Sequence, residues 1–146
     1  TDVKMRFIKE LVAKRKEYKE YLQYGKMMRA PRLENDYTTE IDIAQMSTYG
    51  YKLKGTNLFP HKKVVPMLYS SAWRNKEGNV LLTFVNISEE ERSLSFKIDP
   101  AEYGLGKEGK IYINGVESKE WPAENSEWAT TLPIKGCSTV IIEFKQ

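Results

Sequence analysis

The N-terminal part of the chain carries a helical pattern of hydrophobic positions. Apolar side chains recur every three or four residues between positions 3 and 23, and lysines and arginines fill the opposite face. The pattern predicts one helix of about 20 residues, stopped by Gly25 and prevented from continuing by Pro31. The side chains of this stripe that we expect to contact another surface are Phe7, Ile8, Leu11, Val12, Tyr18 and Leu22.

From Asp36 onward the hydrophobic period changes from three or four residues to two. The alternating segments lie at 37–46, 64–73, 80–87, 92–98, 110–121, 126–134 and 138–144. Polar turns separate most of them, and Asn114-Gly115 is the strongest hairpin signal. Seven to nine short strands and a single helix predict a mainly β fold, an antiparallel β-sandwich with one long N-terminal α-helix.

The length and the charge of the chain limit which classes of function are possible. A chain of 146 residues is long enough for one domain with its own core. No apolar run approaches the roughly 18 residues that span a bilayer, so we expect no membrane partner. Residues 1–32 hold ten basic and four acidic residues, whereas residues 33–146 hold thirteen and sixteen. Because Glu10, Glu17 and Glu20 interrupt the basic residues, we expect a solvated helix face and no nucleic-acid partner.

The candidate chemical groups favour no catalytic, metal or cofactor site. Glu40 and Asp42 alternate with isoleucines, which places the two carboxylates on a solvated strand face. The acidic turn Glu89–Glu91 lacks the spaced oxygen ligands of a calcium site. His61 is the single histidine, which argues against a Ser-His-Asp triad or a zinc site. Cys137 is the single cysteine, so no internal disulfide forms, and its apolar surroundings predict a buried, inert thiol.

Several aromatic residues are candidates for a carbohydrate platform. Sugars present C–H faces to aromatic rings, and Trp or Tyr combine an apolar ring with a polar tip. The candidates are Trp121, Trp128 and Tyr112, with Trp121 the most exposed by its position beside Pro122. Trp73, at the end of a strand, is expected in the core. Core packing is the alternative for all of these rings, since a sandwich of this size buries one or two tryptophans.

Three stretches resemble the C-terminal end of bacterial glycoside-hydrolase-like proteins. "FIKELVAKRKEYKEYLQYGKMMRAP" is similar to the last helix of a (β/α)8 barrel and its exit, with the run Tyr24–Pro31 as the most specific part. "AWRNKEGNVLLTFVNISEEERSLSFKI" and "TLPIKGCSTVIIEF" resemble the central and closing strands of the β-sandwich that follows such barrels. These stretches cover about half of the chain, and the likeness is greatest to an uncharacterised family, a domain of unknown function.

The resemblance implies a noncatalytic role for this chain. In such enzymes the catalytic carboxylates lie on barrel strands, which would precede Thr1, so no catalytic residue carries over. It implies a division into a helical segment, 1–32, and a β-sandwich, 33–146, of glycosidase C-terminal type, which together brace the barrel and shape one wall of its cleft. The expected partners are the upstream barrel or a second copy, with carbohydrate as a further candidate. The compartment stays open between cytoplasm, periplasm and secretion.

Two other functions remain open at this point. One is a free-standing carbohydrate-binding module, which requires coplanar exposed aromatic rings on one sheet face or loop rim. The other is an immunoglobulin-like interaction module that uses an exposed edge strand. The likeness in fold does not choose among these functions, because one fold hosts many of them.

Overall fold

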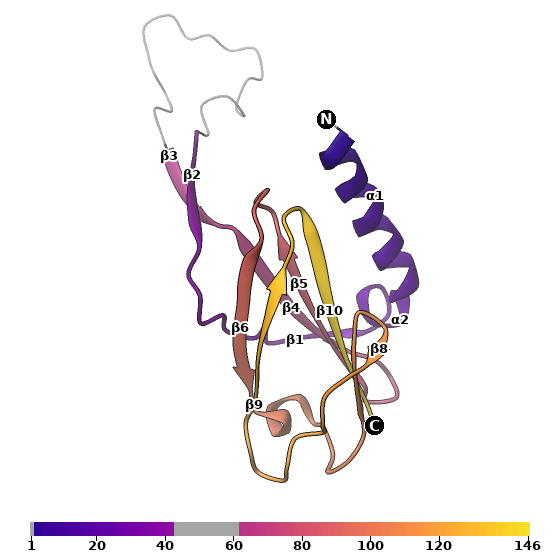
Figure 1. Cartoon of the computed structure of the whole chain (residues 1–146). Coiled ribbons are helices and arrows are strands. Elements are labelled where there is room, and N and C mark those ends of the chain that lie inside the picture. Colours follow the sequence, from indigo (N-terminus) through magenta and orange to yellow (C-terminus); the bar gives the residue numbers. More distant parts are fainter. Residues whose placement is uncertain (1, 43–61) are drawn as a thin grey trace, which may run out of the picture. The chain divides into compact units, whose positions relative to one another are not determined.

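The structure, a computed structural model, describes residues 2–42 and 62–146 (Figure 1). Its contacts form two compact units, Thr1–Asn35 with Leu68–Gln146, and Asp36–Met67. The described residues contain ten strands, all paired antiparallel, and one N-terminal helix of 16 residues, α1. The prediction of a mainly β, antiparallel fold with an N-terminal helix is therefore confirmed.

A six-stranded sheet forms the centre of the larger unit. Its strands, in spatial order, are β1 (Lys26–Met28), β4 (Leu68–Arg74), β5 (Val80–Asn86), β10 (Ser138–Lys145), β7 (Lys110–Ile113) and β8 (Val116–Glu117). The β4–β5 turn holds Gly78 at φ 85°, and the β7–β8 turn holds Asn114 at φ 51° and Gly115 at φ 80°. Positive φ at both central residues is the backbone of a two-residue hairpin, so the predicted Asn114-Gly115 turn is confirmed.

A two-stranded ribbon, β6 (Arg92–Ile98) paired with β9 (Trp128–Ile134), faces this sheet. Alternate side chains of β5, β6 and β10 are buried between the two layers. The rings of Phe84 on β5 and Phe96 on β6 lie 4.5 Å apart between their centroids. The main core therefore lies between the six-stranded sheet and the ribbon.

The fully buried side chain of Asn86 ties together the two turns that cross between these layers. Its amide nitrogen lies 2.8–3.2 Å from the backbone oxygens of Glu90, Ile134 and Lys135, and its amide oxygen accepts from the backbone N–H and the hydroxyl of Ser88. One turn joins β5 to β6 and the other joins β9 to β10. Each therefore leads between the six-stranded sheet, which contains β5 and β10, and the ribbon of β6 and β9. One polar side chain thus satisfies backbone groups that a sheet change leaves without ladder partners.

The helical segment packs on the opposite face of the six-stranded sheet from the ribbon (Figure 1). The predicted single helix is wrong in one respect: α1 (Asp2–Glu17) and α2 (Lys19–Leu22) are separated by a break at Tyr18, with φ −104° and ψ 31°. Tyr18 and Tyr21 are buried against Leu81 and Ile141 of the sheet. The break therefore lies where the chain first packs on the sheet. Helical periodicity in the sequence does not predict this tertiary contact.

The smaller unit contains β2 (Thr38–Asp42) and β3 (Lys62–Pro66), paired antiparallel. Glu40 forms an exposed ion pair with Lys62, at 3.1 Å between Oε1 and Nζ. The strand predicted over 64–73 is interrupted, because β3 ends at Pro66 and β4 begins at Leu68. Proline has no N–H for a ladder, which explains the interruption. The remainder of the segment predicted over 37–46, and His61, lie outside the described residues.

Candidate functional site

Two of the predicted platform residues face the core between the layers. Trp128 is buried, and its ring centroid lies 5.8 Å from that of Phe96 and 5.2 Å from that of Phe144. Trp121 is half-buried with its ring edge-on to Phe144, at 5.9 Å, and its indole N–H donates to the backbone oxygen of Gly106 at 3.1 Å. Trp128 therefore packs between the sheet and the ribbon, and Trp121 packs against Phe144 of the sheet.

Tyr112 lies on the other face of the six-stranded sheet. It pairs with Glu143 on β10, whereas its neighbour Ile111 pairs with Phe144, and successive side chains of a strand point to opposite faces. The ammonium of Lys145 lies 5.2 Å from the centroid of the Tyr112 ring. The structure therefore brings Trp121 and Trp128 together around Phe144 and places Tyr112 apart from both.

The helix divides the six predicted interface residues into two sets. Four of them are buried or half-buried: Phe7, Leu11, Tyr18 and Leu22. Ile8 and Val12 instead remain 52% and 49% exposed, and Met5, three residues before Ile8, is 54% exposed. At 3.6 residues per turn these three lie along one line of the helix, which we call the outward row.

Basic residues border the outward row on both sides. Along the two turns of α1 that hold Met5, Ile8 and Val12, the flanking positions are those of Lys4, Lys9, Arg15 and Lys16. The acidic residues point elsewhere: Glu10 accepts from the hydroxyl of Thr139 at 3.2 Å, and Glu17 pairs with Lys14 at 3.0 Å. The outward row is an apolar strip with a cationic border.

A hollow of about 280 Å³ opens beside the outward row, between α1 and the two sheet-changing turns. Its lining is mostly apolar and consists of Lys4, Phe7, Ile8, Ile87, Glu89 and Cys137. Cys137 is buried there, as predicted, and has a positive φ of 47°. The hollow extends the exposed apolar surface of α1 onto the end of the sheet.

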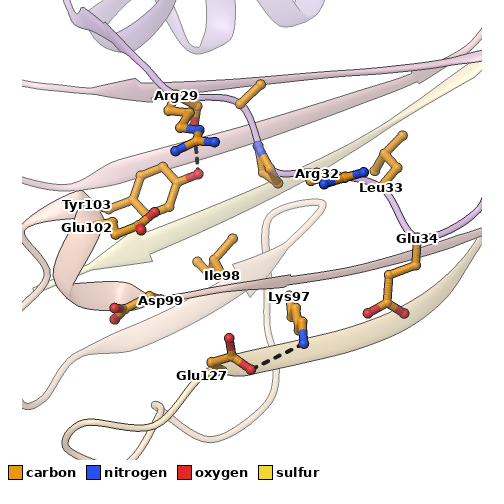
Figure 2. Close-up of a pocket in the computed structure, with 12 residues that line it drawn as sticks. Arg29, Arg32, Leu33, Glu34, Lys97, Ile98, Asp99, Glu102, Tyr103 and Glu127 are labelled. Carbon is orange, nitrogen blue, oxygen red and sulfur yellow. Dashed lines mark hydrogen bonds and ion pairs between the residues drawn. The ribbon is translucent and has the colours of Figure 1, made fainter.

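A larger groove than this hollow lies elsewhere, at residues that were not predicted as a site. It has a volume of about 540 Å³, and residues 29–34 form one wall of it (Figure 2). Strand β6, the 3-10 helix η1 (Pro100–Tyr103) and Glu127, the residue before β9, form the other side. Its lining is Arg29, Ala30, Pro31, Arg32, Leu33, Glu34, Lys97, Ile98, Asp99, Glu102, Tyr103 and Glu127.

Backbone contacts hold the 29–34 wall in place. Leu33 forms an isolated antiparallel bridge with Phe96 of β6, and the N–H of Glu34 donates to the backbone oxygen of Ser95 at 2.8 Å. The segment therefore follows the β6 edge that is not paired with β9. Since β6 has β9 on one side and this segment on the other, its free edge is covered along 95–96.

Tyr103 closes the end of the groove at η1. Its hydroxyl donates to the backbone oxygen of Arg29 at 2.7 Å, which joins η1 to the 29–34 wall (Figure 2). Burial raises the pKa of Tyr103, and the negative charge of Glu102 raises it further, while the charge of Arg29 opposes this. The phenol is therefore a neutral donor at physiological pH, and it fixes the position of the wall.

The groove carries three cationic and four anionic side chains. Lys97 and Glu127 form an ion pair at 3.5 Å, and Asp99 accepts from the N–H of Ala101 at 2.9 Å as the cap of η1. Within the described residues, the guanidinium groups of Arg29 and Arg32 make no hydrogen bond or ion pair, and neither does the carboxylate of Glu102. Donors and acceptors without protein partners therefore lie in the same groove.

Part of the signal for this groove is present in the sequence. Arg29 and Pro31 belong to the run Tyr24–Pro31, the most specific part of the resemblance described above. Lys97, Asp99 and the other facing residues lie far along the chain, so only the fold brings them to the same place. The acidic turn that was considered for a cation instead contains an ion pair between Glu90 and Arg92, at 3.1 Å.

Comparisons with known proteins give no further guide to the site. The chain matches no model of a known protein family, no curated protein and no solved structure. In residues 2–42 and 62–146, no three His, Cys, Asp or Glu side chains converge on a possible metal position. No helix among the same residues has the length and apolar character needed to cross a membrane. The groove and the outward row are therefore the two candidate sites.

Proposed function

We propose that this chain is a noncatalytic β-sandwich module of a glycosidase-like protein, and that its N-terminal helix braces a neighbouring barrel domain of the same polypeptide. Two features support the fold part of the proposal: the ribbon faces the six-stranded sheet across an aromatic core, and a helical segment precedes the strands. We assign the sandwich to the glycosidase C-terminal type that the resemblance implies, and the helix packed on the outer face of the sheet supports this assignment over an immunoglobulin-like one.

The observation that carries this proposal is the outward row. On one face of α1, Phe7 and Leu11 are half-buried and Glu10 accepts a hydrogen bond from Thr139 of β10, yet Met5, Ile8 and Val12 remain about half exposed. A helix that is apolar on two faces is typical of one that lies between two bodies. The sheet occupies one of these faces, and the neighbouring domain occupies the other.

The charge around the outward row selects the kind of neighbour. A second copy of the chain, docked helix against helix about a two-fold axis, would place the cationic border against itself. Like charges at such an interface oppose association. A different surface, apolar at its centre and acidic at its edge, matches the row in both respects. We therefore favour a neighbouring domain of the same polypeptide over a homodimer.

The test compares two lengths of the protein. The variant Met5→Gln, Ile8→Gln, Val12→Gln is made in this chain alone and in the polypeptide encoded by the complete gene. In the chain alone these residues are half exposed, so we expect the free energy of unfolding to change by about 0.5 kcal/mol or less. In the complete polypeptide we expect a loss of about 1 kcal/mol per residue, because burial of the exposed half of each side chain is then lost.

A matched control and two outcomes make this experiment decisive. The control variant, Arg6→Gln with Ala13→Gln, changes exposed positions of α1 outside the outward row and is expected to be neutral at both lengths. Equal effects of the outward-row variant at both lengths would overturn the proposal. So would a complete gene that encodes no further domain beside this chain.

A further inference from the structure

We infer that the hollow beside the outward row holds a tyrosine or tryptophan side chain of the neighbouring domain. Such an anchor rests on the bracing role proposed above and gives that role a defined point of contact. The hollow has a volume of about 280 Å³, which lies below the roughly 300–1,000 Å³ of typical small-molecule sites. It is also far larger than the roughly 30 Å³ that one water occupies. A single large side chain is therefore an occupant of matching size.

The hollow and the outward row form one apolar surface. Ile8 belongs to both, and Ile87, in the turn after β5, lines the hollow and is 43% exposed. Figure 1 shows the N-terminal end of α1 at the same end of the sheet as the β5–β6 and β9–β10 turns. The residues that contribute most to an interface fill pockets of this kind, and the contacts around them exclude water. A surface that covers Met5, Ile8 and Val12 would therefore also cover the hollow.

Phe7 and Lys4 favour an aromatic ring in the hollow. Phe7 is half-buried and contributes a ring to the lining, and two aromatic rings attract each other beyond the area that they bury. The ammonium of Lys4 makes no hydrogen bond or ion pair within the described residues. A cation is attracted to the face of an aromatic ring, most strongly where water is excluded. An aromatic occupant therefore gains contacts from both residues.

Glu89 supplies an acceptor for the polar tip of the ring. Its carboxylate has no hydrogen-bond or ion-pair partner in residues 2–42 and 62–146. A tyrosine hydroxyl or a tryptophan N–H requires such a partner when it is buried at an interface. A phenylalanine or aliphatic occupant would instead cover this carboxylate without giving it a donor, which costs free energy. A polar aromatic side chain therefore matches the apolar lining, the cation and the acceptor together.

The test measures how fast iodoacetamide alkylates Cys137, the single cysteine of this chain and part of the lining of the hollow. The rate is measured in this chain alone and in the polypeptide encoded by the complete gene, by mass spectrometry of the peptide that contains Cys137. In the chain alone the hollow is open to the reagent. In the complete polypeptide we expect alkylation to be slower by about tenfold or more, because the reagent then reaches the thiol only when the two domains open.

Variants at the rim test the kind of occupant. We expect Lys4→Gln and Glu89→Ala each to speed alkylation in the complete polypeptide by about fivefold, because each removes a partner of the buried ring. Each rate is divided by that of the same variant in this chain alone, which removes any direct effect on the thiol. Lys9→Gln and Glu91→Ala are the matched controls, since both residues are exposed, carry the same charges and lie outside the lining. Both are expected to leave the ratio unchanged, because an exposed charge contributes little.

Each remaining outcome overturns the inference. Equal alkylation at both lengths, or no reaction in this chain alone, would show that the hollow is not an open site that the neighbouring domain fills. Protection that neither rim variant changes would show an occupant other than a polar aromatic ring. Protection in this chain alone that rises with its concentration would identify a second copy as the occupant. The bracing proposal is tested separately by the outward-row variant, which can destabilise the complete polypeptide even where Cys137 reacts equally at both lengths.

Discussion

The hydrogen bond between Tyr21 and Glu143 joins the helical segment to the six-stranded sheet. The Tyr21 hydroxyl donates to Oε2 of Glu143 at 2.6 Å, and Tyr21 is 3% exposed while the Glu143 side chain is 13% exposed. The substitution Tyr21→Phe removes the hydroxyl and leaves the ring in place against Leu81 and Ile141. It therefore removes one donor from a carboxylate that is largely shielded from water.

The magnitude follows from the partners that Glu143 keeps. A hydrogen bond to a charged group contributes about 1.5–3 kcal/mol to stability. After the substitution, Oε1 of Glu143 still lies 3.6 Å from the ammonium of Lys145, and a small part of the side chain reaches water. We therefore expect Tyr21→Phe to lower the free energy of unfolding by about 2 kcal/mol, which corresponds to about 4–8 °C in melting temperature for a chain of this size.

Urea unfolding followed by tryptophan fluorescence measures this change, since Trp73 packs against the same cluster. Tyr24→Phe is the control, because Tyr24 is 72% exposed, and it is expected to be neutral. Glu143→Gln completes a double-mutant cycle with Tyr21→Phe. A loss below about 0.5 kcal/mol for Tyr21→Phe, or strict additivity in the cycle, would refute the role assigned to this bond.

Three further predictions concern the turns and the buried tyrosines. Asn86→Ala is expected to cost about 3 kcal/mol or more in urea unfolding, because the backbone oxygens of Glu90, Ile134 and Lys135 lose their hydrogen bonds to the Asn86 amide. A loss below about 1 kcal/mol would contradict this. Gly136→Ala is expected to destabilise the chain far more than Gly115→Ala, because an added Cβ at 136 meets backbone atoms of the facing turn. An added Cβ at 115 meets nothing, so the cost there is only the strain of a φ of 80°, about 1 kcal/mol. Equal melting temperatures of the two variants would contradict this prediction. Burial raises the pKa of Tyr21 and of Tyr103, so above about pH 10 the folded chain retains protons that the unfolded chain releases. Stability is then expected to be constant up to about pH 10 and to fall above it, and unfolding at pH 8 to 11 with no such fall would refute this.

The sequence by itself determined the local elements of this protein. The helical period of the first residues and the turn at Asn114-Gly115 were predicted correctly, because each depends on neighbours in the chain. A positive φ at Asn or Gly and an apolar stripe along a helix are properties of a few consecutive residues. The mainly β, antiparallel character followed from the same local patterns.

The tertiary structure alone decided which elements pair and where side chains gather. The sequence indicates turns after β5 and before β10. It does not indicate that each turn connects one sheet to the other. Trp128 is buried because β9 faces Phe144, and the groove exists because residues 29–34 follow the edge of β6. Such contacts join residues far apart in the chain, and their free energy depends on the packing of whole layers, which a local pattern does not encode.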